Sequence, residues 1–427
     1  MYSPDTSTAY RKVPAVSVGS RWIDILLANE WATAGLIFIL TRLIALLGAY
    51  PGVTSLIAAE PQRNKGWLAE LALMWDAAWY AGIAQNSYSH DASAPGGTNV
   101  AFAPLYPFLM KAISVVLKWI TLGWNWGNET YGSLIAAGLL VSNVSFFVAL
   151  ALLIRLLSPR LGRSGAALVA LGLASLPISF FFSAIYTEGL FLAMVLGAFA
   201  VARSDWDHKW LCAGLLGMLA ALDKFAGLLL FPTLAVEYMS QVGWQWRKIR
   251  LDSIWLALTP LGTAMYVGYL WWRFGTPLVL SSSMAKGWNH KASFFLTTYW
   301  TSLVELWQSL TGAVPREQDP VIYYGNGSRL YKVLDLGMPA ILAVGGLLAR
   351  ARLTASEWTW LGLGIIYPLS TNITFSMARY MLPLWPGLIW LGLPNKSLRR
   401  FSGLVIILSL FLLAWCSNVY GSAKWIG

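Results

Sequence analysis

Long apolar blocks separated by short polar stretches recur from residue 31 to residue 418. A helix needs about 20 residues to cross the hydrocarbon core of a bilayer, and this pattern predicts about eleven spanning helices, several of them shorter than that length. We therefore expect an all-α polytopic membrane protein. The predicted spans are 31–50, 132–157, 163–182, 187–202, 210–222, 225–240, 253–273, 331–349, 356–375, 379–394 and 401–418.

Composition supports the membrane assignment, because 57% of the residues are hydrophobic and only 11% are charged. A soluble globular chain carries about 25% charged residues. The net charge of +11 would suit a nucleic-acid partner. The basic residues, however, lie in short clusters between apolar blocks, as orientation signals do. We expect membrane lipids as partners and no nucleic acid.

The segment 102–122 decides the predicted topology, because it is apolar enough to count as a span. If it crossed, the later basic clusters would lie on the same side as the long loop 51–101. If it does not cross, these clusters all lie in the cytoplasm, as the positive-inside rule requires. At 100° per residue, Lys111 and Lys118 fall on one face and Leu105 on the opposite face. That pattern is typical of a helix lying in the membrane interface.

The chain is then expected to be a single membrane-embedded domain over residues 1–427. Residues 1–30 are cytoplasmic in this prediction, and two long regions, 51–131 and 274–330, lie on the non-cytoplasmic side. The first of these regions carries the amphipathic interfacial helices. The basic clusters expected in the cytoplasm contain Arg11, Lys12, Arg21, Arg155, Arg160, Arg163, Arg203, Lys209, Arg247, Lys248, Arg250, Arg350, Arg352, Lys396, Arg399 and Arg400.

The first outer region contains a candidate catalytic acid. Its apolar periodicity predicts one continuous helix over Trp67–Gln85, with Asp76 at the edge of the apolar stripe and Tyr80 one turn later. A carboxylate beside indole rings at the bilayer surface is costly unless it has a partner or a task. The alternative is an acid that serves only as a surface or capping group.

Two elements in this region resemble the PIG-V mannosyltransferase family. Trp75–Tyr80 reads Trp-Asp-Ala-Ala-Trp-Tyr and is followed by Ile83–Ala84 and Ser87–Tyr88, and Ala101–Pro107 reads Ala-Phe-Ala-Pro-Leu-Tyr-Pro. Family members carry a Trp-Asp, Ile-Ala, Gly-Tyr element followed by an Ala-Phe-Phe-Pro element. Weaker matches follow in the same order along the chain, at Phe182–Phe191, Asp223–Gly227 and Arg379–Tyr380.

The resemblance implies a GT-C glycosyltransferase with a catalytic carboxylate, here Asp76, in its first outer loop and a lipid-phosphate sugar as donor. Eukaryotic members add the second mannose of the glycosylphosphatidylinositol anchor. Two departures are visible, because Ser87 replaces the usual Gly and Lys224 stands where relatives often have Arg. A longer stretch before the proline-rich element makes His90 hard to align. We expect a prokaryotic member in the bacterial cytoplasmic membrane, or one in the endoplasmic reticulum if the source is eukaryotic.

The expected reaction needs few groups. An acceptor hydroxyl loses its proton as it attacks the anomeric carbon, and Asp76 is the expected general base. A single displacement inverts the sugar, whereas hydrolases flank the bond with two carboxylates, and no such pair is evident. The leaving phosphate needs cations. Lys224 and Arg379 are expected to bind it, because both end spans on the outer face, where the positive-inside rule disfavours them.

Other side chains are expected to support substrate binding. Arg42 lies inside the first span, so we expect it to pair with Asp335 or Glu188 or to reach a donor cavity. Glu188 begins a span, where a negative charge is favourable in itself. The histidines show no metal-ligand spacing, so no metal and no cofactor is expected. The remaining candidates for substrate contacts are Trp75, Trp79, Tyr80, His90, Tyr186 and Tyr380.

Two other classes of protein fit parts of the pattern. A secondary transporter or lipid flippase is also polytopic with intramembrane charges. Such proteins usually show internal repeats and short outer loops, and this chain shows neither. A non-catalytic subunit of a glycosylation complex would keep the fold, but the Asp76 motif argues against it. The expected partners are polyprenyl- or dolichyl-phosphate-mannose as donor and a lipid or glycan as acceptor.

Overall fold

The computed structural model describes residues 29–63, 66–90, 98–121, 131–319, 321 and 329–426. Within this part of the chain the structure consists of helices and loops, with one isolated bridge between Ala292 and Thr371 and no strand. The expected all-α class is therefore confirmed for the described residues. Arg11, Lys12 and Arg21 lie outside them.

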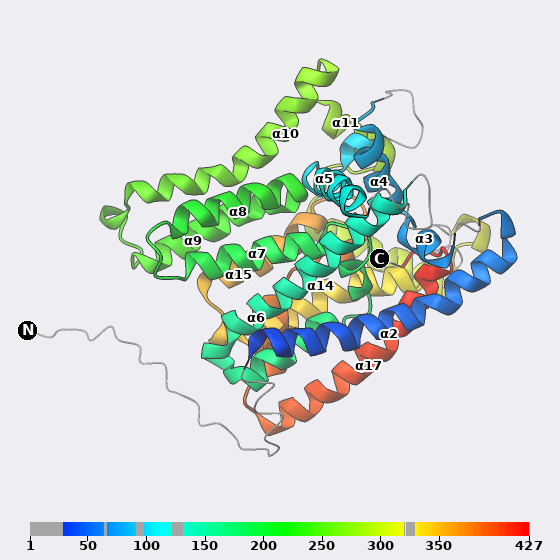
Figure 1. Cartoon of the computed structure of the whole chain (residues 1–427). Coiled ribbons are helices and arrows are strands. Elements are labelled where there is room, and N and C mark those ends of the chain that lie inside the picture. The colour runs from blue at the N-terminus through cyan, green and yellow to red at the C-terminus, as the bar shows by residue number, and fades with distance from the viewer. Residues whose placement is uncertain are drawn as a thin grey trace, which may run out of the picture.

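Long helices lie side by side and form the body of the molecule, running roughly from left to right in Figure 1. Further helices gather at the right-hand end of this body. The helices of this body are α2 (Glu30–Ala59), α6 (Gly132–Ala174), α7 (Glu188–Ala202), α8 (Lys209–Asp223), α9 (Leu230–Gln241), α10 (Leu258–Phe274), α14 (Leu330–Leu348), α15 (Ala355–Leu369) and α17 (Lys396–Gly421). The other α-helices are α3 (Trp67–Ala72), α4 (Asp76–Asn86), α5 (Leu105–Ile120), α11 (Val279–Trp288), α12 (Phe295–Thr311) and α16 (Met377–Tyr380).

Among the described residues, α2, α6, α14 and α17 are the helices long and apolar enough to cross a membrane, and α7 is a shorter apolar helix. The chain is thus an integral membrane protein, but the predicted eleven spans are not reproduced. The predicted span 379–394 is the clearest departure, because α16 stops at Tyr380 and a 3-10 helix covers Trp385–Gly392. Pro383 and Pro386 lie in this segment, and proline cannot donate the backbone hydrogen bond that a continuing helix needs.

Helix α6 contains the two spans predicted over 132–157 and 163–182. The backbone at Gly162 is non-helical, with φ 70° and ψ 164°, so two helical segments meet there at an angle. Glycine adopts this conformation without the steric penalty of a side chain. The second segment ends at Ala174, earlier than predicted, and a 3-10 helix over Ser179–Phe182 leads to α7.

Helices α2 and α17 pack closely through small residues. A Cβ atom at Gly48 would clash with the backbone of Ala414, and one at Gly52 with the backbone of Asn418. Small residues let helix backbones approach closely where lipid removes the usual hydrophobic drive for packing. The outward faces of the same helices remain apolar, with Leu47 70% exposed.

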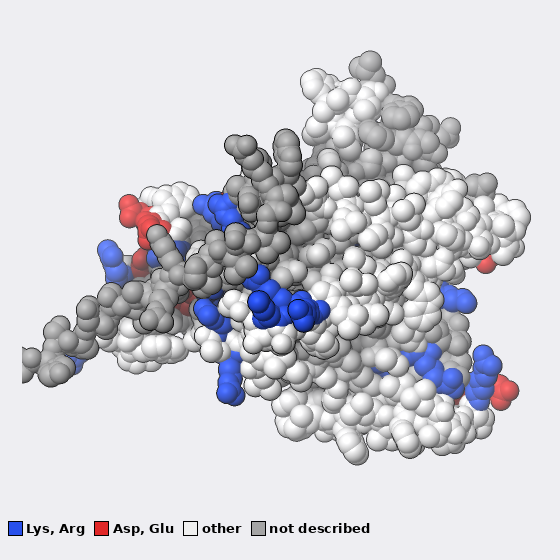
Figure 2. All heavy atoms as spheres, turned by 90° about the horizontal axis from the view of Figure 1, so that it is seen from below, with Lys and Arg blue, Asp and Glu red and all other residues white. Residues whose placement is uncertain are grey.

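The surface seen from below, which includes α2 and α17, fits a membrane environment. Figure 2 shows most of the Lys and Arg side chains toward the two ends of this face and a broad area of uncharged residues between them. Helix α17 carries large exposed apolar side chains such as Leu404 and Phe411. Exposed apolar area of this extent is suited to lipid contact rather than to water.

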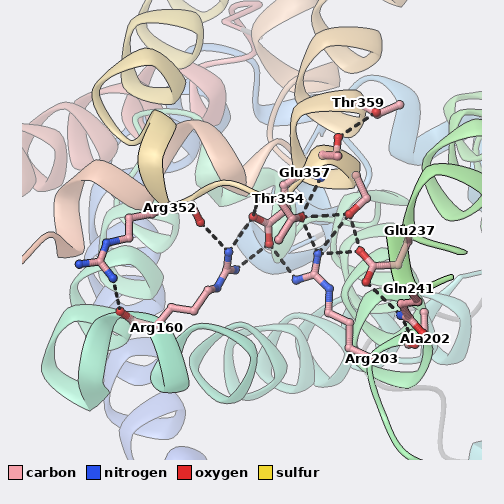
Figure 3. A network of polar contacts seen from close by, with 11 residues as sticks. Arg160, Ala202, Arg203, Glu237, Gln241, Arg352, Thr354, Glu357 and Thr359 are labelled. Atoms are coloured by element: carbon pink, nitrogen blue, oxygen red, sulfur yellow. Dashed lines mark hydrogen bonds and ion pairs between the residues drawn. The ribbon is translucent and has the colours of Figure 1, made fainter. Parts of the chain in front are cut away.

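Three of the basic clusters meet at one end of the helices through Arg160, Arg203 and Arg352, shown close up in Figure 3. Arg160 pairs with Glu357 at 2.6 Å, and Arg203 pairs with both Glu357 and Glu237 at 2.9 Å. Arg160 also donates to the backbone carbonyl of Arg352 at 2.8 Å. These contacts join α6, α7, α9 and α15, so clusters far apart in sequence do lie on one side, as the topology predicts. Which side of the membrane that is stays a prediction.

Helix α5 covers most of the segment predicted to lie in the interface. It has 16 residues, so at 1.5 Å per residue it is about 24 Å long, shorter than the ~30 Å core of a bilayer. Tyr106, Met110 and Ser114 face the protein, whereas Lys111 and Lys118 are exposed. The helix packs against α4 and α6. That it does not cross stays a prediction.

Candidate active site

A cavity of about 290 Å³ opens at the end of the helices opposite to the basic clusters. Helix α7 shows this arrangement directly, because it begins at Glu188 in the cavity wall and ends at Ala202, next to Arg203. Helix α8 ends at Asp223, which also lines the cavity. The volume is near the lower end of the roughly 300–1,000 Å³ typical of ligand pockets. The cavity therefore has the size and the polar lining of a ligand site.

Asp76 enters the cavity from the first turn of α4. The predicted continuous helix over Trp67–Gln85 is wrong, because the chain breaks after α3 and Trp75 adopts φ 57° and ψ −125°. The backbone N–H of Asp76 donates to the hydroxyl of Tyr186 at 3.1 Å, and the ring of Trp75 packs edge-on to Trp425 at 5.2 Å. These tertiary contacts override the local apolar periodicity. Unusual backbone of this kind often occurs at functional sites.

A chain of ion pairs crosses the cavity wall. Asp76 Oδ2 lies 2.6 Å from Arg379 Nη1, and Arg379 Nε lies 3.5 Å from Glu188 Oε1. The same Glu188 oxygen accepts a hydrogen bond from Lys224 Nζ at 2.7 Å. The structure thus brings together the candidate base and both candidate phosphate ligands. Both cations already bind carboxylates in this state.

Aromatic rings surround the two cations. The Arg379 guanidinium lies 5.2 Å from the ring centre of Tyr186 and 5.5 Å from those of Tyr380 and Trp425. Lys224 Nζ lies 4.9 Å from the Tyr380 ring. Such contacts attract a cation to the face of the ring. Both cations are therefore held in place by groups other than their carboxylate partners.

Tyr80 contributes a neutral hydroxyl to the same cavity. Burial raises its pKa, and the nearby carboxylates of Glu188 and Asp76 raise it further. The phenol therefore keeps its proton at neutral pH and can donate a hydrogen bond. This assigns Tyr80 a binding chemistry and not a role as a base.

Four of the predicted supporting residues do not line this cavity, and three of them are Trp79, His90 and Tyr186. The ring of Trp79 stacks on Phe102 at 5.8 Å, one layer behind the cavity wall. His90 Nδ1 lies 3.3 Å from the hydroxyl of Thr98, away from the cavity. The hydroxyl of Tyr186 accepts a hydrogen bond from the backbone N–H of Asp76 and so acts on the cavity only through that residue. Trp79 and Tyr186 therefore support the wall residues Phe102 and Asp76, whereas His90 forms no hydrogen bond with a lining residue in the described part of the chain.

Arg42 is the fourth residue outside the cavity lining, and its predicted pairing with Asp335 or Glu188 is wrong. Its guanidinium donates to the carbonyl of Ser179 at 2.6 Å and to that of Ala174 at 2.8 Å. Ala174 ends α6, and the negative end of a helix dipole attracts a cation. Arg42 instead faces a second, mostly apolar cavity of about 230 Å³ between α2, α3, α6 and α17.

Asp335 has a different task from the predicted pairing, because its Oδ1 accepts the backbone N–H of Ala378 at 2.8 Å. Ala378 precedes Arg379 in the short helix α16. Asp335 therefore fixes the segment that carries Arg379, across a sequence separation that no local pattern reveals.

The cavity also contains residues that the sequence reasoning did not select. Asp223 and His290 line it, and so does Trp425 near the end of the described chain. Burial lowers the pKa of the His290 imidazole, which favours its neutral form. The sequence could have indicated Asp223 as a site residue, because it directly precedes Lys224 in the Asp223–Gly227 segment that resembles the PIG-V family. Nothing in the local sequence distinguishes Trp425 or His290.

No group of three or more His, Cys, Asp or Glu side chains suited to a metal ion occurs among the described residues. The acids of the cavity are instead engaged with Arg379 and Lys224, apart from Asp223. Chemistry without a metal stays a prediction. The cavity is thus lined by the carboxylate of Asp76, the cations Lys224 and Arg379, and the neutral phenol of Tyr80.

Comparisons with known proteins give a distant match in structure alone. No protein-family model matches this chain, and no curated protein matches it. Among solved structures, the Archaeoglobus fulgidus oligosaccharyltransferase tethered with an acceptor peptide has 15% identity over 91% of this chain and 55% of that chain, with a TM-score of 0.49. The archaeal oligosaccharyltransferase AglB from the same organism, in complex with an inhibitory peptide and a dolichol-phosphate, has 12% identity over 92% and 56%, with a TM-score of 0.43. The chain spans about half the length of these structures.

Proposed function

We propose that this chain is an inverting membrane glycosyltransferase of the GT-C type. It transfers a hexose from polyprenyl or dolichyl phosphate to a hydroxyl of a lipid-linked or glycan acceptor. The observation that carries the proposal is the ion-pair chain from Asp76 through Arg379 and Glu188 to Lys224 in the wall of one cavity. Mannose as the sugar and a relation to the PIG-V family rest on the motif resemblance. The reaction takes place on the non-cytoplasmic face of the bacterial cytoplasmic membrane, or of the endoplasmic reticulum in a eukaryote.

Asp76 is the general base of the proposed reaction. Its side chain is 19% exposed, whereas that of Glu188 is 2% exposed, so an acceptor hydroxyl reaches Asp76 more readily. The carboxylate takes the hydroxyl proton as the acceptor oxygen bonds to the anomeric carbon. The bond from that carbon to the phosphate oxygen breaks, and the electron pair leaves with the polyprenyl phosphate. A single displacement inverts the anomeric centre.

Arg379 and Lys224 stabilise the leaving phosphate. In the present state Arg379 binds Asp76, and its Nε is buried without a hydrogen-bond partner. A donor phosphate near this nitrogen competes with Asp76 for the guanidinium and weakens their ion pair. Donor binding then has two effects. Arg379 stabilises the charge of the phosphate, and Asp76 is released from its ion pair and can act as the base. Charge-assisted contacts of this kind are stronger in a partly dry cavity than in water.

The experiment is a transfer assay with the purified chain in nanodiscs. Labelled polyprenyl-phosphate-mannose and membrane lipid are supplied, and the label is followed into a new glycoside. We expect transfer with inverted anomeric configuration. Movement of intact donor between leaflets without a new glycoside would identify a flippase, and binding without either result would identify a non-catalytic subunit. Either result contradicts the proposal.

The sidedness is tested in proteoliposomes with inserted protein of known orientation. Donor and acceptor are added to one side only, and product is measured before and after the membrane is opened. We expect product when the substrates face the Asp76 end of the helices. Product only from the Arg203 end would contradict the assigned face.

A further inference from the structure

Asp223 differs from Asp76 and Glu188 because its side chain forms no hydrogen bond or ion pair with any residue that the structure describes. It ends α8 and is 1% exposed, and it lines the cavity. Neither of its carboxylate oxygens has a hydrogen-bond partner in the described part of the chain. Asp76 binds Arg379 and Glu188 binds Lys224 in the same wall. Asp223 therefore lies in the cavity wall with two buried acceptor atoms that no described residue uses.

The adjacent cation does not supply the missing contact. Lys224 follows Asp223 directly, but its Nζ donates to Glu188 at 2.7 Å. A buried carboxylate without hydrogen bonds is costly, and buried polar groups in native proteins are nearly always satisfied. The cavity in its present state leaves this cost uncompensated. A ligand with hydrogen-bond donors would remove it.

The chemistry of the missing partner follows from the acceptor atoms. A carboxylate offers two oxygens that accept hydrogen bonds side by side. A phosphate anion brings acceptors and negative charge, and a polyprenyl chain brings no polar hydrogen at all. Neighbouring hydroxyls of a hexose bring two donors at a matching spacing. Trp288 and Trp75 line the same cavity and provide apolar ring surface for the carbon skeleton of a sugar.

We infer that Asp223 accepts hydrogen bonds from two hydroxyls of the transferred sugar and thereby selects the sugar part of the donor. This inference rests on the proposed function, and it assigns the cations to the phosphate and Asp223 to the hexose. Asp76 keeps the role of the base. Asp223 is thus a specificity residue and does not take part in proton transfer.

The test compares two ligands that differ only in the sugar. The affinity of wild-type protein and of Asp223→Ala is measured in nanodiscs for polyprenyl-phosphate-mannose and for polyprenyl phosphate without sugar. We expect the variant to lose about 10- to 150-fold in affinity for the sugar-loaded lipid, as hydrogen bonds to a charged group predict. Its affinity for the sugar-free lipid should stay within about 3-fold of the wild-type value, since no phosphate contact is lost.

Two further variants control for folding and for remote charge. Asp223→Asn keeps the size of the side chain and one acceptor oxygen, so it should bind the loaded lipid between wild type and Asp223→Ala. Asp252→Asn removes the charge of a carboxylate outside the cavity lining. Its Oδ1 accepts a hydrogen bond from the hydroxyl of Tyr238 at 2.9 Å. This substitution should leave both affinities unchanged. Donors whose sugar lacks a single hydroxyl should bind wild-type protein more weakly than the complete donor does. The Asp223→Ala substitution should reduce the affinity for these donors by much less than it reduces the affinity for the complete donor.

Three results would overturn the inference. Equal losses for the loaded and the sugar-free lipid would show that Asp223 acts on the phosphate or on folding. A lower kcat with an unchanged KM and unchanged affinity would assign it to proton transfer. Wild-type protein that binds both lipids equally would show that no sugar contact exists. Wild-type protein that prefers the loaded lipid but forms no glycoside would contradict the transferase and leave the sugar contact supported, so the two failures are distinguishable.

Discussion

Each end of the helical body holds a buried cluster of positive and negative side chains. The Arg203 end is called the closed end, because the carboxylates of its cluster have all their hydrogen-bond partners. The Asp76 end is called the open end, because its cluster borders the cavity and contains polar atoms without such partners in the described part of the chain. At the Arg203 end, Glu357 accepts hydrogen bonds from Arg160, from Arg203 and from the backbone N–H of Thr354. At the Asp76 end, by contrast, four buried atoms have no hydrogen-bond partner among the described residues, namely Glu188 Oε2, both oxygens of Asp223 and Arg379 Nε.

The difference separates a structural cluster from a binding site. In the first cluster, every carboxylate oxygen of Glu357 and Glu237 has a partner, and the network joins four helices. A satisfied buried network fixes the arrangement of the elements that carry it. The second cluster has similar residues but borders a cavity of about 290 Å³. Its unused groups are those that a charged and hydroxylated ligand would satisfy.

The largest expected effect comes from the base at the open end. Asp76→Asn should fold and bind donor but lose about 10²–10⁴-fold in turnover, the usual contribution of a positioned base. Its unfolding midpoint should change little, because the side chain is partly exposed to the cavity. Turnover is measured in single-turnover assays and stability by thermal unfolding in detergent. Near-normal turnover would remove Asp76 from the mechanism.

The closed end should respond in the opposite way. Glu357→Ala leaves Arg160 and Arg203 without their shared carboxylate, and removing one partner of a buried ion pair costs about 3–5 kcal/mol. The free energy of unfolding should fall by this amount, while the protein that remains folded should keep its kcat. Glu357→Gln retains acceptor and donor groups and should lose less stability. Loss of kcat without loss of stability would remove the distinction between the two clusters.

The cations at the open end should show the next largest effect. Lys224→Ala or Arg379→Ala removes charge-assisted contacts to the donor phosphate, each worth about 1.5–3 kcal/mol. Donor affinity should fall by roughly 10- to 150-fold, and acceptor affinity should change much less. Titration of polyprenyl-phosphate-mannose into nanodiscs measures both. Wild-type donor affinity in both variants would make the two residues structural, and Lys286 and Lys291 in the second outer region would become the next candidates.

The sequence was sufficient for features that depend on local pattern. Apolar blocks located most helices, and the positive-inside rule grouped Arg160 with Arg203 and Arg352 before any contact was known. The resemblance selected Asp76 and Arg379, whose side chains meet across 303 positions of sequence. Their roles stay predictions.

What the sequence could not supply depends on distant contacts. The break at Trp75 follows from contacts with Tyr186 and Trp425, which periodicity within one segment does not contain. Arg42 was expected to need a carboxylate, yet backbone carbonyls at the end of α6 satisfy it. The absence of a partner for Asp223 also becomes visible only when the neighbouring elements are in place.

The smallest expected effect separates the two cations by the geometry of their contacts. Lys224 makes a single hydrogen bond to Glu188, as a point charge does, so Lys224→Arg should keep much of the activity if the longer side chain fits beside Tyr380. Arg379 uses Nη1 for Asp76 and directs Nε toward Glu188, and a lysine has only one nitrogen to replace both. Arg379→Lys should therefore lose more donor affinity than Lys224→Arg, although both substitutions conserve charge. Parallel measurements of donor affinity and kcat/KM test this order. Equal losses would mean that charge alone matters at the open end, and the fork of Arg379 would then have no special part in binding the phosphate.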